Sequence, residues 1–171
     1  MDFNDIKVRI DKPYPEITCA SDSPMTVGIL KNLAFSRASE LSAILQYIYQ
    51  SVIADKSMSE VADILEEIGI VEMTHMDMLM HAIVDFGGLP KYEDAQGYTF
   101  NANCVYTGTK LKDMLDQNMS GEKHAIEQYR EAMKRVKNES LIALFARIIE
   151  DEERHIEIFK KLRDGIHFLS I

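Results

Sequence analysis

Two short motifs of the same kind stand far apart in the sequence. In each, a histidine follows a glutamate by three residues: Glu72-Met-Thr-His75 and Glu152-Glu-Arg-His155. Side chains at positions i and i+3 share one face of a helix, so each motif would present a carboxylate and an imidazole together. Such a pair can bind a metal ion. Either motif alone could arise by chance, so the interpretation depends on what accompanies them.

A second repeated pattern precedes each motif. Tyr47 follows Glu40 by seven residues, and Tyr129 follows Glu122 by seven residues, which is two helical turns along one face. The order Glu…Tyr, then Glu-x-x-His, therefore occurs twice along the chain. This internal repeat predicts a pseudo-two-fold bundle of helices. Its candidate metal ligands are Glu40, Glu72, His75, Glu122, Glu152 and His155.

The six residues match the needs of two metal ions held side by side. Four carboxylates neutralise the four positive charges of two divalent ions, and two neutral imidazoles complete the coordination. A glutamate from each of two helices, with a Glu-x-x-His pair from each of the other two, forms such a centre inside helical bundles. Oxygen and imidazole ligands suit iron or manganese, and the absence of nearby thiolates argues against structural zinc.

The elements that must position these residues are predicted to be long helices. Gly and Pro are scarce outside a few segments, and apolar residues recur at helical spacing. Ser57 and Glu60 have the spacing of a capping box, which would start the second helix after Ser57 or Ser59. Four helices are predicted, over residues 24–48, 58–86, 109–136 and 139–163.

Two segments lie outside these helices. Residues 87–108 form a connection that is long for a compact domain, and such a segment can carry the chain from one end of a bundle to the other. Residues 1–23, with Pro13 and Pro15, predict an extended N-terminal arm, and residues 24–171 the bundle domain. The expected fold class is all-α: an antiparallel four-helix bundle with a long crossover between its second and third helices.

Composition narrows the function classes. The net charge of -9 would repel nucleic acid, and no apolar run reaches the roughly 20 residues that a membrane span needs. Cys19 and Cys104 form no C-x-x-C pair, so we expect no iron–sulfur or zinc–thiolate module. The first residues lack the apolar stretch of a signal peptide. We therefore expect a cytoplasmic protein with no nucleic-acid or membrane partner.

Four segments of the sequence resemble the four metal-binding helices of bacterioferritin, and they are similar to those of rubrerythrin and the manganese catalases. These segments are ELSAILQY, EMTHMDML, EKHAIEQYREAM and EDEERHIEIF. The resemblance implies that Glu40 and Glu122 are terminal ligands, one for each metal. It implies that Glu72 and Glu152 bridge the two metals. It also implies that His75 and His155 each bind one of the metals. Tyr47 matches a tyrosine that can relay an electron, and Met73 matches a haem-ligating methionine.

The sequence also departs from these families. Only residues 156–171 follow His155, too few for the full extra C-terminal helix of bacterioferritin, so we expect no storage shell. It lacks the rubredoxin-like cysteine module of a complete rubrerythrin. The long aromatic crossover, with Tyr98, Phe100 and Tyr106, is closer to the manganese catalases, and we expect it to cover the bundle or an oligomer interface.

Some residues have simpler interpretations. Tyr47 and Tyr129 can pack inside the bundle with their hydroxyls bonded to ligand carboxylates. Asp151 is a candidate hydrogen-bond partner for a ligating histidine. Met73 is more often core filler than a haem ligand, so we expect no haem. The remaining histidines are expected to be ordinary surface or packed residues; these are His81, His124 and His167.

The function that follows is that of a non-haem di-metal oxidoreductase with two iron ions, or alternatively two manganese ions. It would oxidise ferrous iron with dioxygen or hydrogen peroxide, or reduce peroxide. The alternatives are a dimanganese catalase that dismutates hydrogen peroxide and an iron-storage oligomer. We expect a homo-oligomer smaller than a ferritin shell, most simply a dimer, paired through the outer faces of the first two helices. Met76, Met80 and Ile83 are expected on that surface.

Overall fold

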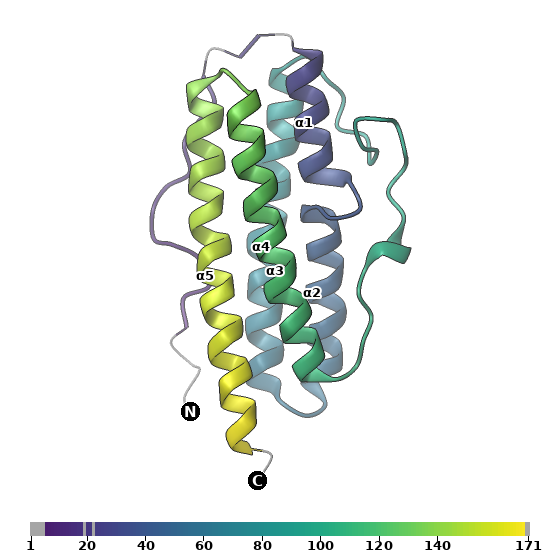
Figure 1. Cartoon of the computed structure of the whole chain (residues 1–171), viewed down its shortest axis with the longest axis vertical. Helices are drawn as coiled ribbons and strands as arrows, with labels where there is room; N and C mark the ends of the chain where they lie inside the picture. Colours follow the sequence, from purple (N-terminus) through teal and green to yellow (C-terminus); the bar gives the residue numbers. More distant parts are fainter. Residues whose placement is uncertain (1–5, 19, 22, 170–171) are drawn as a thin grey trace.

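The computed structural model describes residues 6–18, 20–21 and 23–169, with side chains described as far as residue 165. The expectations for Cys19 and His167 lie outside that description. The main helices are α1 (Pro24–Phe35), α2 (Glu40–Asp55), α3 (Ser59–Asp85), α4 (Leu111–Arg135) and α5 (Glu139–Leu169). In Figure 1, α1 and α2 stand end to end in one column, so the five helices make a four-column bundle. The predicted all-α four-helix fold is confirmed.

The prediction of one unbroken first helix is wrong. The helix ends at Phe35, and the chain becomes extended at Ser36 before α2 begins at Glu40. Ser39 precedes α2, and its backbone N–H donates to Ser42 Oγ at 2.8 Å, a contact that a continuous helix would not make. Short serine side chains readily bond nearby backbone in this way and so favour helix ends. The break places the carboxylate of Glu40 in the first turn of α2.

Two other helix limits differ from those expected. The predicted capping box does not form at α3: Met58 is its N-cap without a side-chain hydrogen bond, and Ser57 Oγ instead donates to the carbonyl of Ala54. Helix α5 continues to Leu169, beyond the expected end. Helix α3 stops as expected at Gly87, whose φ of 83° suits glycine in the left-handed region.

The apolar core lies in two clusters. One joins α1 to the neighbouring ends of α3, α4 and α5, around Leu30 and Phe145. The other joins α2 to the opposite ends of α3, α4 and α5, around Leu65 and Phe159. Burying one such side chain contributes about 1.5–3 kcal/mol, so together the clusters can offset the cost of burying polar groups between them. Most of the buried ionisable residues occupy the region between the two clusters.

The crossover and the N-terminal arm run along opposite sides of the bundle (Figure 1). Crossover residues 86–110 pass beside α1 and α2, where Lys31 pairs with Glu93 at 2.7 Å and the rings of Phe35 and Tyr92 make a T-shaped contact. Within the crossover, Ala102–Cys104 forms a short 3-10 helix. Tyr98 points mainly to solvent. The arm lies along α5, where Lys12 pairs with Glu150 at 2.9 Å.

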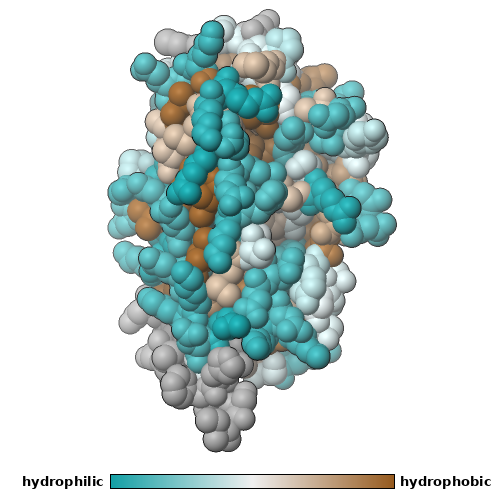
Figure 2. Space-filling model, in the orientation of Figure 1, coloured by the Kyte–Doolittle hydropathy of each residue, from teal (hydrophilic) through white to brown (hydrophobic). Residues whose placement is uncertain are grey.

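The molecular surface is mostly polar on the face where α4 and α5 lie in front. Figure 2 shows this face as largely hydrophilic, with narrow apolar strips between the helices. None of the helices, within the described part of the chain, has the length and hydropathy that a membrane span requires. The methionine-rich outer surface expected on α3 is not present as predicted: Ile83 is fully buried, and Met76 and Met80 are half-buried against the core.

Candidate metal centre

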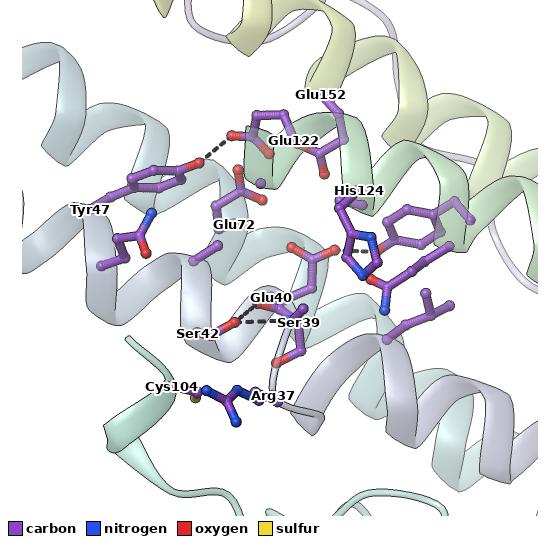
Figure 3. Close-up of a pocket in the computed structure, with 18 of the residues that line it drawn as sticks. Arg37, Ser39, Glu40, Ser42, Tyr47, Glu72, Cys104, Glu122, His124 and Glu152 are labelled. Carbon is purple, nitrogen blue, oxygen red and sulfur yellow. Dashed lines mark hydrogen bonds between the residues drawn. The ribbon is translucent and has the colours of Figure 1, made fainter. Parts of the chain in front are cut away.

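The six predicted ligands come together from four helices in the middle of the bundle, and all are buried. Glu40 is the first residue of α2, and Glu122 lies in α4. Each of α3 and α5 supplies one Glu-x-x-His pair, as the spacing predicted. Figure 3 shows the four glutamates pointing toward one another. The structure thus brings together every residue that the sequence proposed as a ligand.

Two glutamates reach both histidines, each with one oxygen per histidine. Glu72 Oε2 lies 2.9 Å from His75 Nδ1, and its Oε1 lies 3.0 Å from His155 Nδ1. Glu152 Oε1 lies 3.3 Å from His75 Nδ1, and its Oε2 lies 3.1 Å from His155 Nδ1. Both carboxylates therefore span the space between the two imidazoles, which is the placement that a bridging ligand requires.

The other two glutamates each approach a single histidine. Glu40 Oε2 lies 3.8 Å from His75 Nδ1, and Glu122 Oε1 lies 3.5 Å from His155 Nδ1. The ligand atoms form two four-residue groups, each within 4.8 Å, and Glu72 and Glu152 belong to both groups. This arrangement separates two terminal carboxylates from two shared ones.

The residues fit a pair of cations. Glu72 Oε1 and Glu152 Oε1 are buried, and although each lies near a histidine Nδ1, neither makes a hydrogen bond of regular geometry to the residues that the structure describes. Buried carboxylate oxygens without donors are costly unless a proton or a cation compensates them. Four buried carboxylates within one small volume therefore provide a strong physical reason for two divalent ions to bind here.

The pKa values of these groups in the metal-free protein also reflect the cost of burying four carboxylates together. Burial raises the pKa of Glu40 to about 8, and burial together with Glu152 and Glu72 raises the pKa of Glu122 well above its usual range. Burial opposes ionisation of Glu72, but His155 and His75 lower its pKa below the usual range. Protons thus compensate part of the charge in the metal-free protein, and metal ions must displace them.

The two tyrosines of the repeat contact the terminal glutamates. The hydroxyl of Tyr47 donates to Glu122 Oε1, and the hydroxyl of Tyr129 donates to Glu40 Oε1. Each tyrosine thus bonds the glutamate of the other half of the repeat, not the one on its own helix. Burial and the nearby carboxylates raise the pKa of both phenols well above 10, so each remains a donor.

His75 contacts, through its Nε2 atom, a group of side chains that includes a residue of the N-terminal arm. Asp151 Oδ2 lies 3.3 Å from His75 Nε2, as expected of a partner for a ligating histidine. Tyr14 donates its hydroxyl to the same oxygen at 2.6 Å. Sequence reasoning missed Tyr14, because an arm without helical periodicity gives no signal of what it lies against.

A cavity of about 170 Å³ leads to the carboxylates from the side of α2 and α4. Its outer part is lined by Arg37 and Ser39, at the break between α1 and α2, and by Cys104 of the crossover (Figure 3). His124, expected to be an ordinary surface or packed residue, also lines it. A cavity of this volume is large enough for dioxygen, hydrogen peroxide or a metal ion, and up to about the size of a benzene ring.

Comparisons with known proteins identify the family of this chain. A family model for rubrerythrin matches residues 31–163. A bacterioferritin of Desulfovibrio desulfuricans is 30% identical over 147 residues, which cover 84% of this chain and 77% of the relative. A bacterioferritin of Brucella melitensis is 26% identical over 129 residues, covering 73% of this chain and 76% of the relative.

Solved structures show the same bundle. One is a bacterioferritin structure from Desulfovibrio desulfuricans, described with its diiron site in different catalytic states. It has a TM-score of 0.73 and is 28% identical in sequence, and the match covers 84% of this chain and 81% of that chain. KatB, a manganese catalase from Anabaena, has a TM-score of 0.84 at 23% identity, covering 92% and 80%, a likeness of fold alone. With a family model that spans well over half of its length, and with a relative 30% identical across 84% of it, this chain belongs to the rubrerythrin family of the ferritin-like di-iron superfamily.

Proposed function

We propose that this protein binds two iron ions and is a non-haem oxidoreductase that oxidises ferrous iron with dioxygen or peroxide, or reduces peroxide. The observation that carries the proposal is that two carboxylates each lie close to both histidines of the site. They are those of Glu72 and Glu152, and the histidines are His75 and His155. These residues would hold two ferrous ions, whose chemistry there would be to supply the two electrons for reduction of one O–O bond. Glu40 and Glu122 would complete one subsite each.

The protein's own groups would prepare the site for this chemistry. The shared carboxylates hold the two positions together, and the tyrosine hydroxyls orient the terminal carboxylates. The two apolar clusters keep bulk water from the centre, so reactants enter by the cavity between α2 and α4. That cavity is large enough to admit dioxygen, hydrogen peroxide and ferrous iron.

The experiment that tests this function compares two metals in one protein. Metal-free protein is loaded without oxygen with ferrous iron or with manganese, and each form is then mixed with dioxygen or hydrogen peroxide. We expect the iron form to consume oxidant, and we expect the manganese form to release no dioxygen from peroxide. Rapid dioxygen release by the manganese form would replace our proposal with the dimanganese catalase.

Tyr47 is the residue that we propose to relay an electron to the centre. Tyr129 is a matched control, because it makes the same kind of hydrogen bond to the other terminal glutamate. We expect Tyr47→Phe to slow reoxidation of the iron-loaded protein in stopped-flow absorbance measurements by clearly more than Tyr129→Phe, which removes only the hydrogen bond that orients Glu40. Equal slowing in both variants would mean that both tyrosines only orient carboxylates.

Closing the cavity should slow the reaction without removing the metal. Gly121 lines the cavity on α4, and a Cβ built there meets no other atom within 4 Å. Gly121→Phe would fill the cavity, so we expect slower oxidant consumption at unchanged metal content. Gly121→Ala is the control, expected to keep the rate and to stabilise α4 by about 0.5–1 kcal/mol. An unchanged rate in Gly121→Phe would rule out this entry route.

We also propose that the protein is a homo-oligomer, most simply a dimer, located in the cytoplasm and without haem. The support for the oligomer is a group of exposed apolar side chains on α2 and α3: Ile48, Val52, Ile70 and Met73. Ile48 lies against Gly69, the neighbour of Ile70, so the two helices contribute to one surface. Light scattering should give the mass of a dimer. A mass of many subunits would favour the iron-storage alternative.

A further inference from the structure

The two halves of the centre differ in what supports each histidine. Asp151 stands just before Glu152 in α5, and its Oδ2 lies 3.3 Å from Nε2 of His75 in α3. The residue at the matching position of α3, just before Glu72, is Val71, which has no polar side chain. Consistent with this, His155 Nε2 is buried and makes no hydrogen bond within the described residues. The carboxylate support is therefore present at one histidine only.

The N-terminal arm holds this single supporting carboxylate in place. Asp151 is fully buried, and its Oδ1 accepts the backbone N–H of Ile10 at 2.7 Å and pairs with Arg147 at 2.8 Å. Its Oδ2 accepts the hydroxyl of Tyr14 at 2.6 Å, and the Tyr14 oxygen is also 3.4 Å from His75 Nε2. With donors on both oxygens, the carboxylate is fixed in position facing His75.

Arg147 ties the arm and the carboxylate into one unit. Its guanidinium donates to the carbonyl of Ile10 at 2.7 Å and to that of Lys12 at 3.1 Å, and it lies 4.6 Å from the centre of the Tyr14 ring. The arm is thus bound to the same side chains that support His75. No comparable contact of the arm reaches His155 among the described residues.

We propose that the arm makes the two metal positions unequal, so that the subsite of Glu40 and His75 binds its metal first and more tightly than the subsite of Glu122 and His155. The physical reason is that a histidine that donates its outer N–H to a carboxylate is fixed in the tautomer and ring orientation that the metal needs, and is a stronger donor. Tyr14 is a positioning residue in this scheme. The inference rests on the proposed di-metal centre.

Two matched variants separate the subsites. Glu122→Ala leaves the His75 subsite complete, and Glu40→Ala leaves the His155 subsite complete. Binding of manganese(II) alone is measured from the electron paramagnetic resonance signal of the free ion. We expect the ion to bind Glu122→Ala about 10–100-fold more tightly than Glu40→Ala, the effect typical of losing a partner of a ligating histidine. Equal affinities, or the opposite order, would overturn the inference.

The role of the arm is tested by Tyr14→Phe in each of these two backgrounds. This change removes the hydroxyl and keeps the ring beside Arg147. We expect manganese affinity to fall about tenfold in the Glu122→Ala background and to stay unchanged in the Glu40→Ala background. A purely structural role would lower both affinities alike and would overturn the inference. Wild-type protein that binds no divalent metal would refute the proposed function itself, whereas two equal sites would refute only the inequality.

Discussion

Glu72→Ala should abolish binding of both metal ions, the largest effect that we expect from a single substitution. Glu72 places one oxygen near each histidine, so its removal takes a ligand from both subsites at once. His75→Ala should be milder, because the second subsite keeps its four residues. Metal content after dialysis against excess manganese(II), with circular dichroism to verify the helices, measures both outcomes.

The control for this prediction is Glu153→Ala. Glu153 is the next residue after Glu152, but its side chain is 54% exposed and pairs with Arg130 at the surface. Exposed substitutions of this kind usually change stability by no more than about 0.5 kcal/mol. We expect wild-type metal content in this variant. Equal metal content in Glu72→Ala and Glu153→Ala would contradict the bridging assignment.

The stability of the metal-free protein should fall as the pH rises from about 5 to 8. Burial raises the pKa of Glu40 from 4.5 to about 8, so over this range the folded protein holds a proton that the unfolded chain has released. The hydrogen bonds of His75 raise its pKa despite burial, which acts in the same direction. A pKa rise of this size corresponds to roughly 5 kcal/mol for Glu40 alone.

Bound metal should reverse this trend, because metal ions compete with protons for the same oxygens. We expect the gain in melting temperature on adding manganese(II) to be larger at pH 8.5 than at pH 6. Thermal unfolding with a chelator and with metal, at both pH values, measures the difference. Glu40→Gln is the control, since its neutral amide should flatten the pH dependence of the metal-free protein. A metal-free protein that gains stability between pH 6 and 8.5 would refute the prediction.

The sequence by itself determined the four-helix fold and the six residues at its centre. Both follow from local periodicity: residues three or seven apart share one face of a helix whatever that helix packs against. It also follows that the two Glu-x-x-His motifs meet inside the bundle. Helices pack with their apolar faces inward, so polar residues that lie on an apolar face are buried with it. No long-range information is needed for these conclusions.

Only the tertiary structure decided which groups touch. It paired Tyr47 with Glu122 and Tyr129 with Glu40, across the two halves of the repeat. It broke the first helix before Glu40, although the apolar pattern continues through the break. It also placed Tyr14 on Asp151, 137 residues away in the chain. Each of these contacts depends on how separate elements approach one another in space, and the spacing of residues within one element carries no record of that approach.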